Sequence, residues 1–124
     1  MNIKVFFWGI YIIYSIIVFL LSSRPDVGVK QLFYGQDKII HFTLYALHSY
    51  LGMLALNERN FNKKFKPYLL ILVISFSFSL FNEVYQCFIP EREFSLGDII
   101  ANFLGITICL LLIYGLKVKK SAWH

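Results

Sequence analysis

Three stripes of polar or small residues interrupt an otherwise apolar sequence. Within each stripe the spacing is three or four residues, which keeps the members on one face of a helix. The stripes are Asp37, His41, Tyr45 and His48; Glu83 and Gln86; and Asp98, Asn102 and Gly105. A histidine among carboxylates can serve acid–base chemistry, metal binding or simple ion pairing.

The acid–base candidates are His41, Glu83 and Asp98, with Asp37 to orient the histidine. The same four side chains offer enough ligands for one divalent ion, but their spacing follows no fixed metal motif, so no tightly bound metal or cofactor is expected. The sequence contains no Ser-His-Asp order, no glycine-rich phosphate loop and no CxxC motif. An activated nucleophile is therefore not visible.

Arg92 lies in a short connection between two apolar segments, with Arg24 and Lys38 expected nearby. A guanidinium group can grip a phosphate or carboxylate through paired hydrogen bonds. The structural alternative is an ion pair that braces the loop through Glu91, Glu93 or Asp98.

The composition is that of a membrane protein: 58% of the 124 residues are hydrophobic and only 15% are charged. Four apolar segments are near the roughly 20 residues that cross a bilayer. They predict an all-α, four-helix transmembrane bundle with spans of about 4–21, 38–56, 68–88 and 97–116, forming a single domain over residues 1–124. The first segment is read as a span and not a signal peptide, because no A-x-A cleavage pattern follows it.

The charges predict the topology. Eight of the twelve basic residues lie at the two termini or in the second loop, and six of the seven acidic residues lie on the other side. The positive-inside rule makes the basic side cytoplasmic, so the three stripes lie toward the outer leaflet. The basic clusters then serve topology and anionic lipid contacts, and no nucleic-acid partner is expected.

Several local features complete the expectation. Asp37 suits the positive end of its helix, Pro67 suits a first helical turn, and Ser95 is an N-cap candidate. Gly9 and Ser15 are small enough to let another helix approach. Cys87 and Cys109 lie too far apart in depth to form a disulfide.

Polar groups in a bilayer are costly unless they face one another or a hydrated cleft, so the stripes are expected to converge. One interpretation is interhelical hydrogen bonding alone, and His48, deeper in the membrane, is assigned that structural role. The other is a ligand site open to the outer leaflet, made of Asp37, Lys38, His41, Tyr45, Glu83, Gln86, Arg92, Asp98 and Asn102.

The ordered residues resemble the VanZ-like family of small bacterial membrane proteins. The resemblance is carried by three groups: Ser22, Ser23 and Pro25; Asp37, Lys38, His41, Phe42 and Tyr45; and Glu83, Gln86, Pro90, Arg92, Ser95, Asp98, Asn102 and Gly105. It implies a multi-pass protein of the bacterial cytoplasmic membrane, with a role in the cell envelope. A named relative is associated with antibiotic resistance, as reduced sensitivity to teicoplanin. The resemblance implies no catalytic residues.

Three functions stay open. The outer cleft can bind the head group of a membrane lipid or a lipid-linked wall intermediate, with an effect on glycopeptide sensitivity. Alternatively, His41, Asp37, Glu83 and Asp98 can act as acid–base groups on a lipid-linked phosphate or ester. A third alternative is a purely structural partner of another membrane protein, through the aromatic first segment.

The topology prediction can be tested by cysteine labelling of intact cells. We expect single cysteines in the first and third loops to react with an impermeant reagent, and cysteines at Lys63 or Lys119 to react only after the membrane is opened. Strong external labelling at Lys63 or Lys119 would reverse the orientation.

Overall fold

The computed structural model of the protein describes residues 2–23, 35–56, 65–90 and 94–122, and these residues form four α-helices. The helices are α1 (Ile3–Ser22), α2 (Gln36–Leu56), α3 (Lys66–Gln86) and α4 (Leu96–Ala122). Each helix contains a segment long and apolar enough to cross a membrane. The predicted all-α, four-helix transmembrane architecture is confirmed, whereas the side of the membrane that each end faces stays a prediction.

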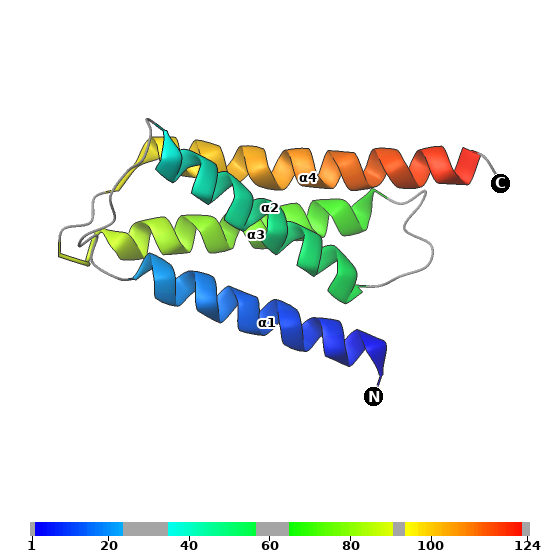
Figure 1. Ribbon diagram of the computed structural model, residues 1–124, viewed down its shortest axis with the longest axis horizontal. Helices are drawn as coiled ribbons and strands as arrows, with labels where there is room; N and C mark the ends of the chain where they lie inside the picture. The colour runs from blue at the N-terminus through cyan, green and yellow to red at the C-terminus, as the bar shows by residue number, and fades with distance from the viewer. Residues whose placement is uncertain (1, 24–34, 57–64, 91–93, 123–124) are drawn as a thin grey trace.

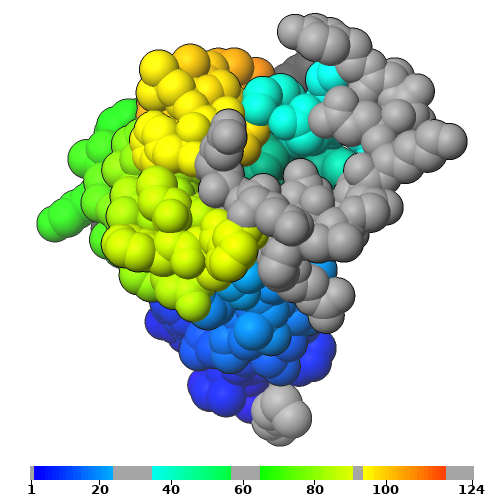
Figure 2. Space-filling model, turned by 90° about the vertical axis from the view of Figure 1, so that its left-hand side faces the viewer, coloured from blue at the N-terminus to red at the C-terminus, as the bar shows by residue number. Residues whose placement is uncertain are grey.

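The four helices run alternately up and down, so the N-terminal end of α1 and the C-terminal end of α4 lie at the same end of the bundle (Figure 1). The opposite end gathers the last turns of α1 and α3 and the first turns of α2 and α4. We call it the polar end. Figure 2, which looks onto this end, shows α4 beside both α2 and α3. In the same view α1 lies below α3, on the side away from α4.

The four helices begin one or two residues before the predicted spans, and the ends of α3 and α4 also differ from the prediction. α3 ends at Gln86, before the expected 88, because Cys87 and Phe88 donate to the carbonyls of Val84 and Tyr85 at 3.1 and 3.0 Å. These i→i−3 bonds tighten the chain into a turn. α4 continues past 116 to Ala122, through a lysine-containing segment with good helix propensity.

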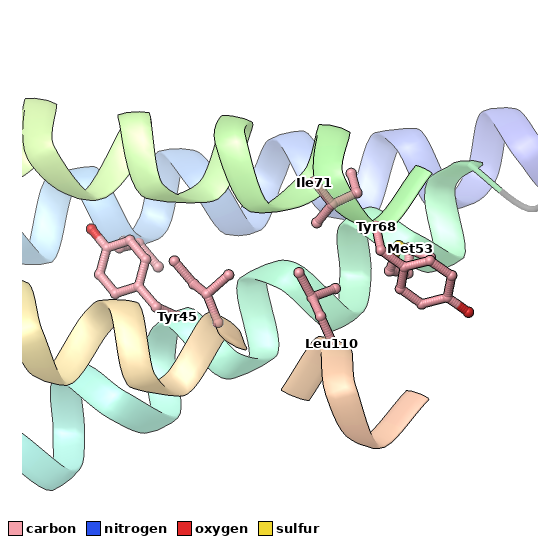
Figure 3. Close-up of a cluster of buried hydrophobic side chains, with 7 residues drawn as sticks. Tyr45, Met53, Tyr68, Ile71 and Leu110 are labelled. Atoms are coloured by element: carbon pink, nitrogen blue, oxygen red, sulfur yellow. The ribbon is translucent and has the colours of Figure 1, made fainter. Parts of the chain in front are cut away.

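The apolar core lies along the bundle axis. Its buried members are Val18, Tyr45, Met53, Tyr68, Ile71, Ile106 and Leu110 (Figure 3). Large apolar side chains such as Ile12, Ile16 and Leu112 are exposed on the outer surface of the bundle, as lipid contact requires. Because lipid tails are as apolar as these side chains, close packing and polar contacts must specify how the helices pair.

α2 and α4 cross closely at Gly105. A Cβ atom built there would collide with the backbone carbonyl of Phe42. The sequence places Gly105 in the α4 stripe with Asp98 and Asn102, and its missing side chain lets the polar stripes of the two helices meet. Gly9 allows no comparable close approach of another helix to α1, because a Cβ atom there would have no atom within 4 Å. The prediction of a close helix contact at Gly9 is therefore wrong.

Two further expectations hold. Pro67 lies in the first turn of α3, where a missing backbone N–H costs nothing. Cys87 and Cys109 are both free, as their difference in depth predicts.

The Gly105 crossing gives a stability prediction. We expect Gly105→Ala to lower the midpoint of thermal unfolding in detergent, because overpacking typically costs about 1–3 kcal/mol. Gly115→Ala, on the same helix, is the matched control, since a Cβ atom at Gly115 meets nothing within 4 Å. Equal midpoints for the two variants, measured by thermal-shift size-exclusion chromatography, would refute the close crossing.

Candidate functional site at the polar end

The first turn of α2 carries charged groups to the end of the bundle. Gly35 adopts φ +83°, a left-handed conformation that favours glycine, immediately before the helix. Its carbonyl accepts from the backbone N–H of Lys38 at 3.1 Å, so the helix starts with Asp37 and Lys38 in its first turn. Asp37 therefore lies at the positive end of the helix dipole, as predicted.

α4 begins with a capped turn in which two acidic residues have separate roles. The Ser95 hydroxyl accepts from the backbone N–H of Asp98 at 3.2 Å, which confirms Ser95 as the N-cap. In a capping box the acidic residue three positions on would accept from the N-cap amide. Here Glu83 of α3 takes that place, and its Oε1 accepts from the Ser95 N–H at 2.8 Å. The carboxylate of Asp98 is thereby left for other partners.

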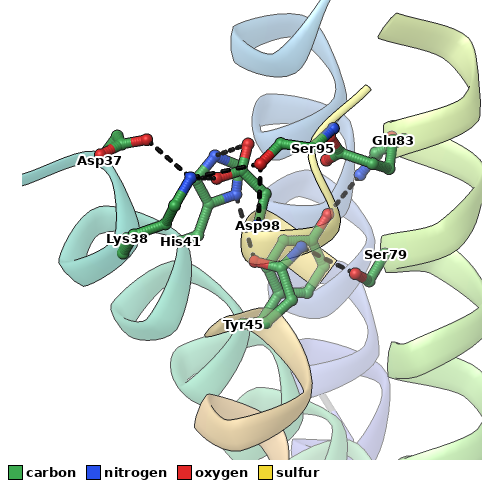
Figure 4. A network of polar contacts seen from close by, with 10 residues as sticks. Asp37, Lys38, His41, Tyr45, Ser79, Glu83, Ser95 and Asp98 are labelled. Atoms are coloured by element: carbon green, nitrogen blue, oxygen red, sulfur yellow. Dashed lines mark hydrogen bonds and ion pairs between the residues drawn. The ribbon is translucent and has the colours of Figure 1, made fainter. Parts of the chain in front are cut away.

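Lys38 ties α2 to the start of α4. Its Nζ lies 2.5 Å from Asp98 Oδ1, 3.0 Å from Asp37 Oδ2 and 3.3 Å from Ser95 Oγ (Figure 4). The side chain is 41% exposed and that of Asp98 only 12%, so the ammonium group reaches from the surface toward a nearly buried carboxylate. A Cβ atom at Gly97 would lie 3.0 Å from Lys38 Cε, which shows that glycine leaves room for this side chain over α4.

His41 lies one turn deeper on α2 and connects Asp98 to a buried amide. Its Nε2 is 3.4 Å from Asp98 Oδ2, and its Nδ1 is 3.1 Å from Asn102 Oδ1. Asn102 in turn donates from Nδ2 to Ser79 Oγ of α3 at 2.8 Å. In this orientation both ring nitrogens face oxygen atoms of α4 side chains.

A second contact between α2 and α3 lies beside this network. Asn82 Nδ2 donates to Tyr45 Oη at 2.6 Å, and both side chains are buried. Tyr45 is one of the site residues predicted from the sequence, whereas Asn82 and Ser79 are not. Both lie on one α3 face with Ser75, Glu83 and Gln86, at spacings of three or four residues. Including small polar residues in the search for helical stripes would have found them.

His48 belongs to a separate series of buried, hydrogen-bonded side chains in the middle of the bundle. Its Nε2 lies 2.9 Å from Ser15 Oγ of α1, and its Nδ1 lies 2.9 Å from Ser75 Oγ of α3. The ring also stacks on Phe78, with centroids 4.9 Å apart. These contacts join three helices and accord with the structural role expected for His48.

The structure thus brings most of the predicted site residues together at the polar end. Glu83, Asp98 and Asn102 are buried against the stripe of α2, and Gln86 is buried one turn beyond Glu83. Arg92 lies outside the described residues, so its role in binding a phosphate or carboxylate stays a prediction. Among the residues that the structure describes, no group of three or more His, Cys, Asp or Glu side chains is placed to hold a metal ion.

The fold and the site define a class: a four-helix, multi-pass membrane protein with a paired polar network at one end of its bundle. The family model for VanZ/LLP1 matches residues 5–118, nearly the whole chain, so the protein belongs to the VanZ/LLP1 family. Comparisons with curated proteins and with solved structures gave no match.

Proposed function

We propose that this protein binds the anionic head group of an envelope lipid, or of a lipid-linked wall intermediate, at the outer surface of the bacterial cytoplasmic membrane. The observation that carries the proposal is the position of Lys38. Its ammonium group is partly exposed, contacts the cap of α4 through Ser95, and pairs with Asp98. It therefore lies where a head group at the membrane surface would meet the buried network.

Two helix starts and the Lys38 ammonium group bring positive charge to the polar end. The N-terminal ends of α2 and α4 both lie at the polar end, and each helix dipole contributes partial positive charge there. Lys38 adds a full positive charge on α2. In the free protein this ammonium group pairs with two carboxylates, Asp37 and Asp98, so an anionic head group would displace one of them. A phosphate can replace a carboxylate as the partner of Lys38 without leaving the ammonium group unpaired.

The geometry favours binding over acid–base catalysis. A general base needs a free lone pair within hydrogen-bond reach of the proton that it removes. The nitrogens of His41 point at Asp98 and Asn102, and Glu83 Oε1 accepts from the Ser95 amide, so each of these groups is directed at a protein partner. These contacts hold side chains in place around Lys38, which is the arrangement of a binding site. An effect on teicoplanin-type sensitivity would follow if the bound lipid became less available to the antibiotic.

The binding proposal can be tested with a small phosphate probe. Farnesyl phosphate should bind to the purified protein in zwitterionic nanodiscs, and farnesol should not. Lys38→Gln should weaken the binding about tenfold, since a hydrogen bond to a charged group contributes roughly 1.5–3 kcal/mol. Titrations followed by native mass spectrometry would measure both effects.

Lys66→Gln is the matched control, because Lys66 is an exposed lysine at the opposite end of the bundle. It should bind farnesyl phosphate as the unchanged protein does. Equal binding by Lys38→Gln and Lys66→Gln would rule out a phosphate site at Lys38.

A further inference from the structure

Two apolar hollows lie in line between α3 and α4. The first, of about 260 Å³, is nearer the polar end and is lined by Phe76 together with Ile99, Ile100, Phe103 and Leu104. The second, of about 200 Å³, lies farther along the same pair of helices; its walls include Leu69, Leu72, Thr107, Leu111 and Tyr114. Each is smaller than the roughly 300 Å³ at which typical ligand pockets begin, so neither suits a compact ligand by itself.

The spacing of the lining residues places both hollows on one side of the α3–α4 pair. On α4, Ile100, Leu104, Thr107, Leu111 and Tyr114 follow each other at steps of four, three, four and three residues. Such steps keep side chains on a single face of a helix. On α3, Leu69, Leu72 and Phe76 do the same. We call this continuous apolar line the α3–α4 seam.

The seam is longer than one leaflet. From Ile100 to Tyr114 the helix rises about 21 Å at about 1.5 Å per residue. Half of a hydrocarbon core about 30 Å thick is about 15 Å. A phospholipid acyl chain whose head group lies at the polar end would end near the bilayer midplane, and it would leave the far part of the second hollow, beside Tyr114, unfilled.

The seam and the polar network share the N-terminal turn of α4, on opposite faces of that helix. Ile99 lines the first hollow and directly follows Asp98, which pairs with Lys38. The first turn of α4 also contains Gly97, which presents no side chain between the two. Ile100 and Leu104 lie on the face of α4 opposite Asp98 and Asn102, so the first part of a tail held at Lys38 would cross this turn of α4 to enter the seam.

From this arrangement we infer that the lipid bound at Lys38 is a polyisoprenyl phosphate, whose single long tail runs along the α3–α4 seam past the bilayer midplane. The inference rests on the proposed function for the head group and adds the class of the tail. A single chain matches two narrow hollows in one line, whereas a diacyl lipid would have to leave its second chain outside. The aromatic wall formed by Phe76 and Phe103, with centroids 5.2 Å apart, offers flat surfaces to the planar double bonds of isoprene units.

The experiment compares lipids that share a phosphate head group and differ in their hydrocarbon tails. Native mass spectrometry of the full chain in detergent would measure binding of a C15 polyprenyl phosphate, a C55 polyprenyl phosphate and dioleoyl phosphatidic acid. We expect the C55 phosphate to bind at least tenfold more tightly than either of the others. Leu111→Trp, which fills the second hollow, should reduce this advantage to less than threefold and leave the C15 phosphate unchanged.

Leu112→Trp is the matched control, because Leu112 is 62% exposed, as Leu111 is at 61%, but does not line either hollow. It should retain the full C55 preference. That result would show that the tail binds in the second hollow and does not merely partition into the detergent micelle around the protein. A C55 preference that Leu111→Trp and Leu112→Trp affect equally would overturn the inference. So would phosphatidic acid binding as tightly as the C55 phosphate.

The experiment distinguishes a wrong head-group site at Lys38 from a wrong assignment of the tail. If C15 and C55 phosphates bind alike and both depend on Lys38, the head-group site stands and the tail assignment is wrong. If no phosphate depends on Lys38, the proposed function is wrong, and the tail assignment fails with it.

Discussion

The hydrogen bond from the Ser95 amide to the Glu83 carboxylate organises the polar end of this bundle. Backbone N–H groups at a helix start have no partner within the helix, and in a membrane protein each must find one. Glu83 supplies that partner from another helix, so the cap of α4 also fixes α4 against α3. Because Glu83 occupies the amide, Asp98 can turn to Lys38 and His41 of α2. One buried carboxylate thereby determines the pairing of three helices.

The remaining polar contacts follow from the same constraint. Asn102 lies between His41 and Ser79, and Gly105 allows the backbones of α2 and α4 to come close enough for that contact. Helix association in lipid gains little from apolar burial, and individual hydrogen bonds contribute only about 0.6 kcal/mol on average. A connected network is a reasonable way to specify one arrangement of four apolar helices. The exposed ammonium group of Lys38 is the part of this network best placed to meet a ligand.

Much of this arrangement could be predicted from the sequence. The four spans follow from length and hydropathy, and the facing of the stripes follows from the cost of exposing Glu83 or Asn102 to lipid. The division of roles between Glu83 and Asp98 could not be predicted, because it depends on which carboxylate reaches the Ser95 amide in three dimensions. The parts played by Ser79 and Asn82 were missed, since a serine or an asparagine in an apolar helix gives a weaker signal than a charge. The α3–α4 seam was also invisible, because a hollow between apolar residues leaves no compositional trace.

The most direct test of this account is a double-mutant cycle between Glu83 and Lys38, two described residues that form no hydrogen bond or ion pair with each other. Without Glu83, we expect Asp98 to turn back to the Ser95 amide as in an ordinary capping box and to release Lys38. Lys38→Ala should therefore destabilise the unchanged protein more than it destabilises the Glu83→Leu variant, with a coupling energy of at least about 0.5 kcal/mol in unfolding free energy. Free energies that add within about 0.3 kcal/mol, as for independent sites, would contradict the claim that Glu83 frees Asp98 for Lys38.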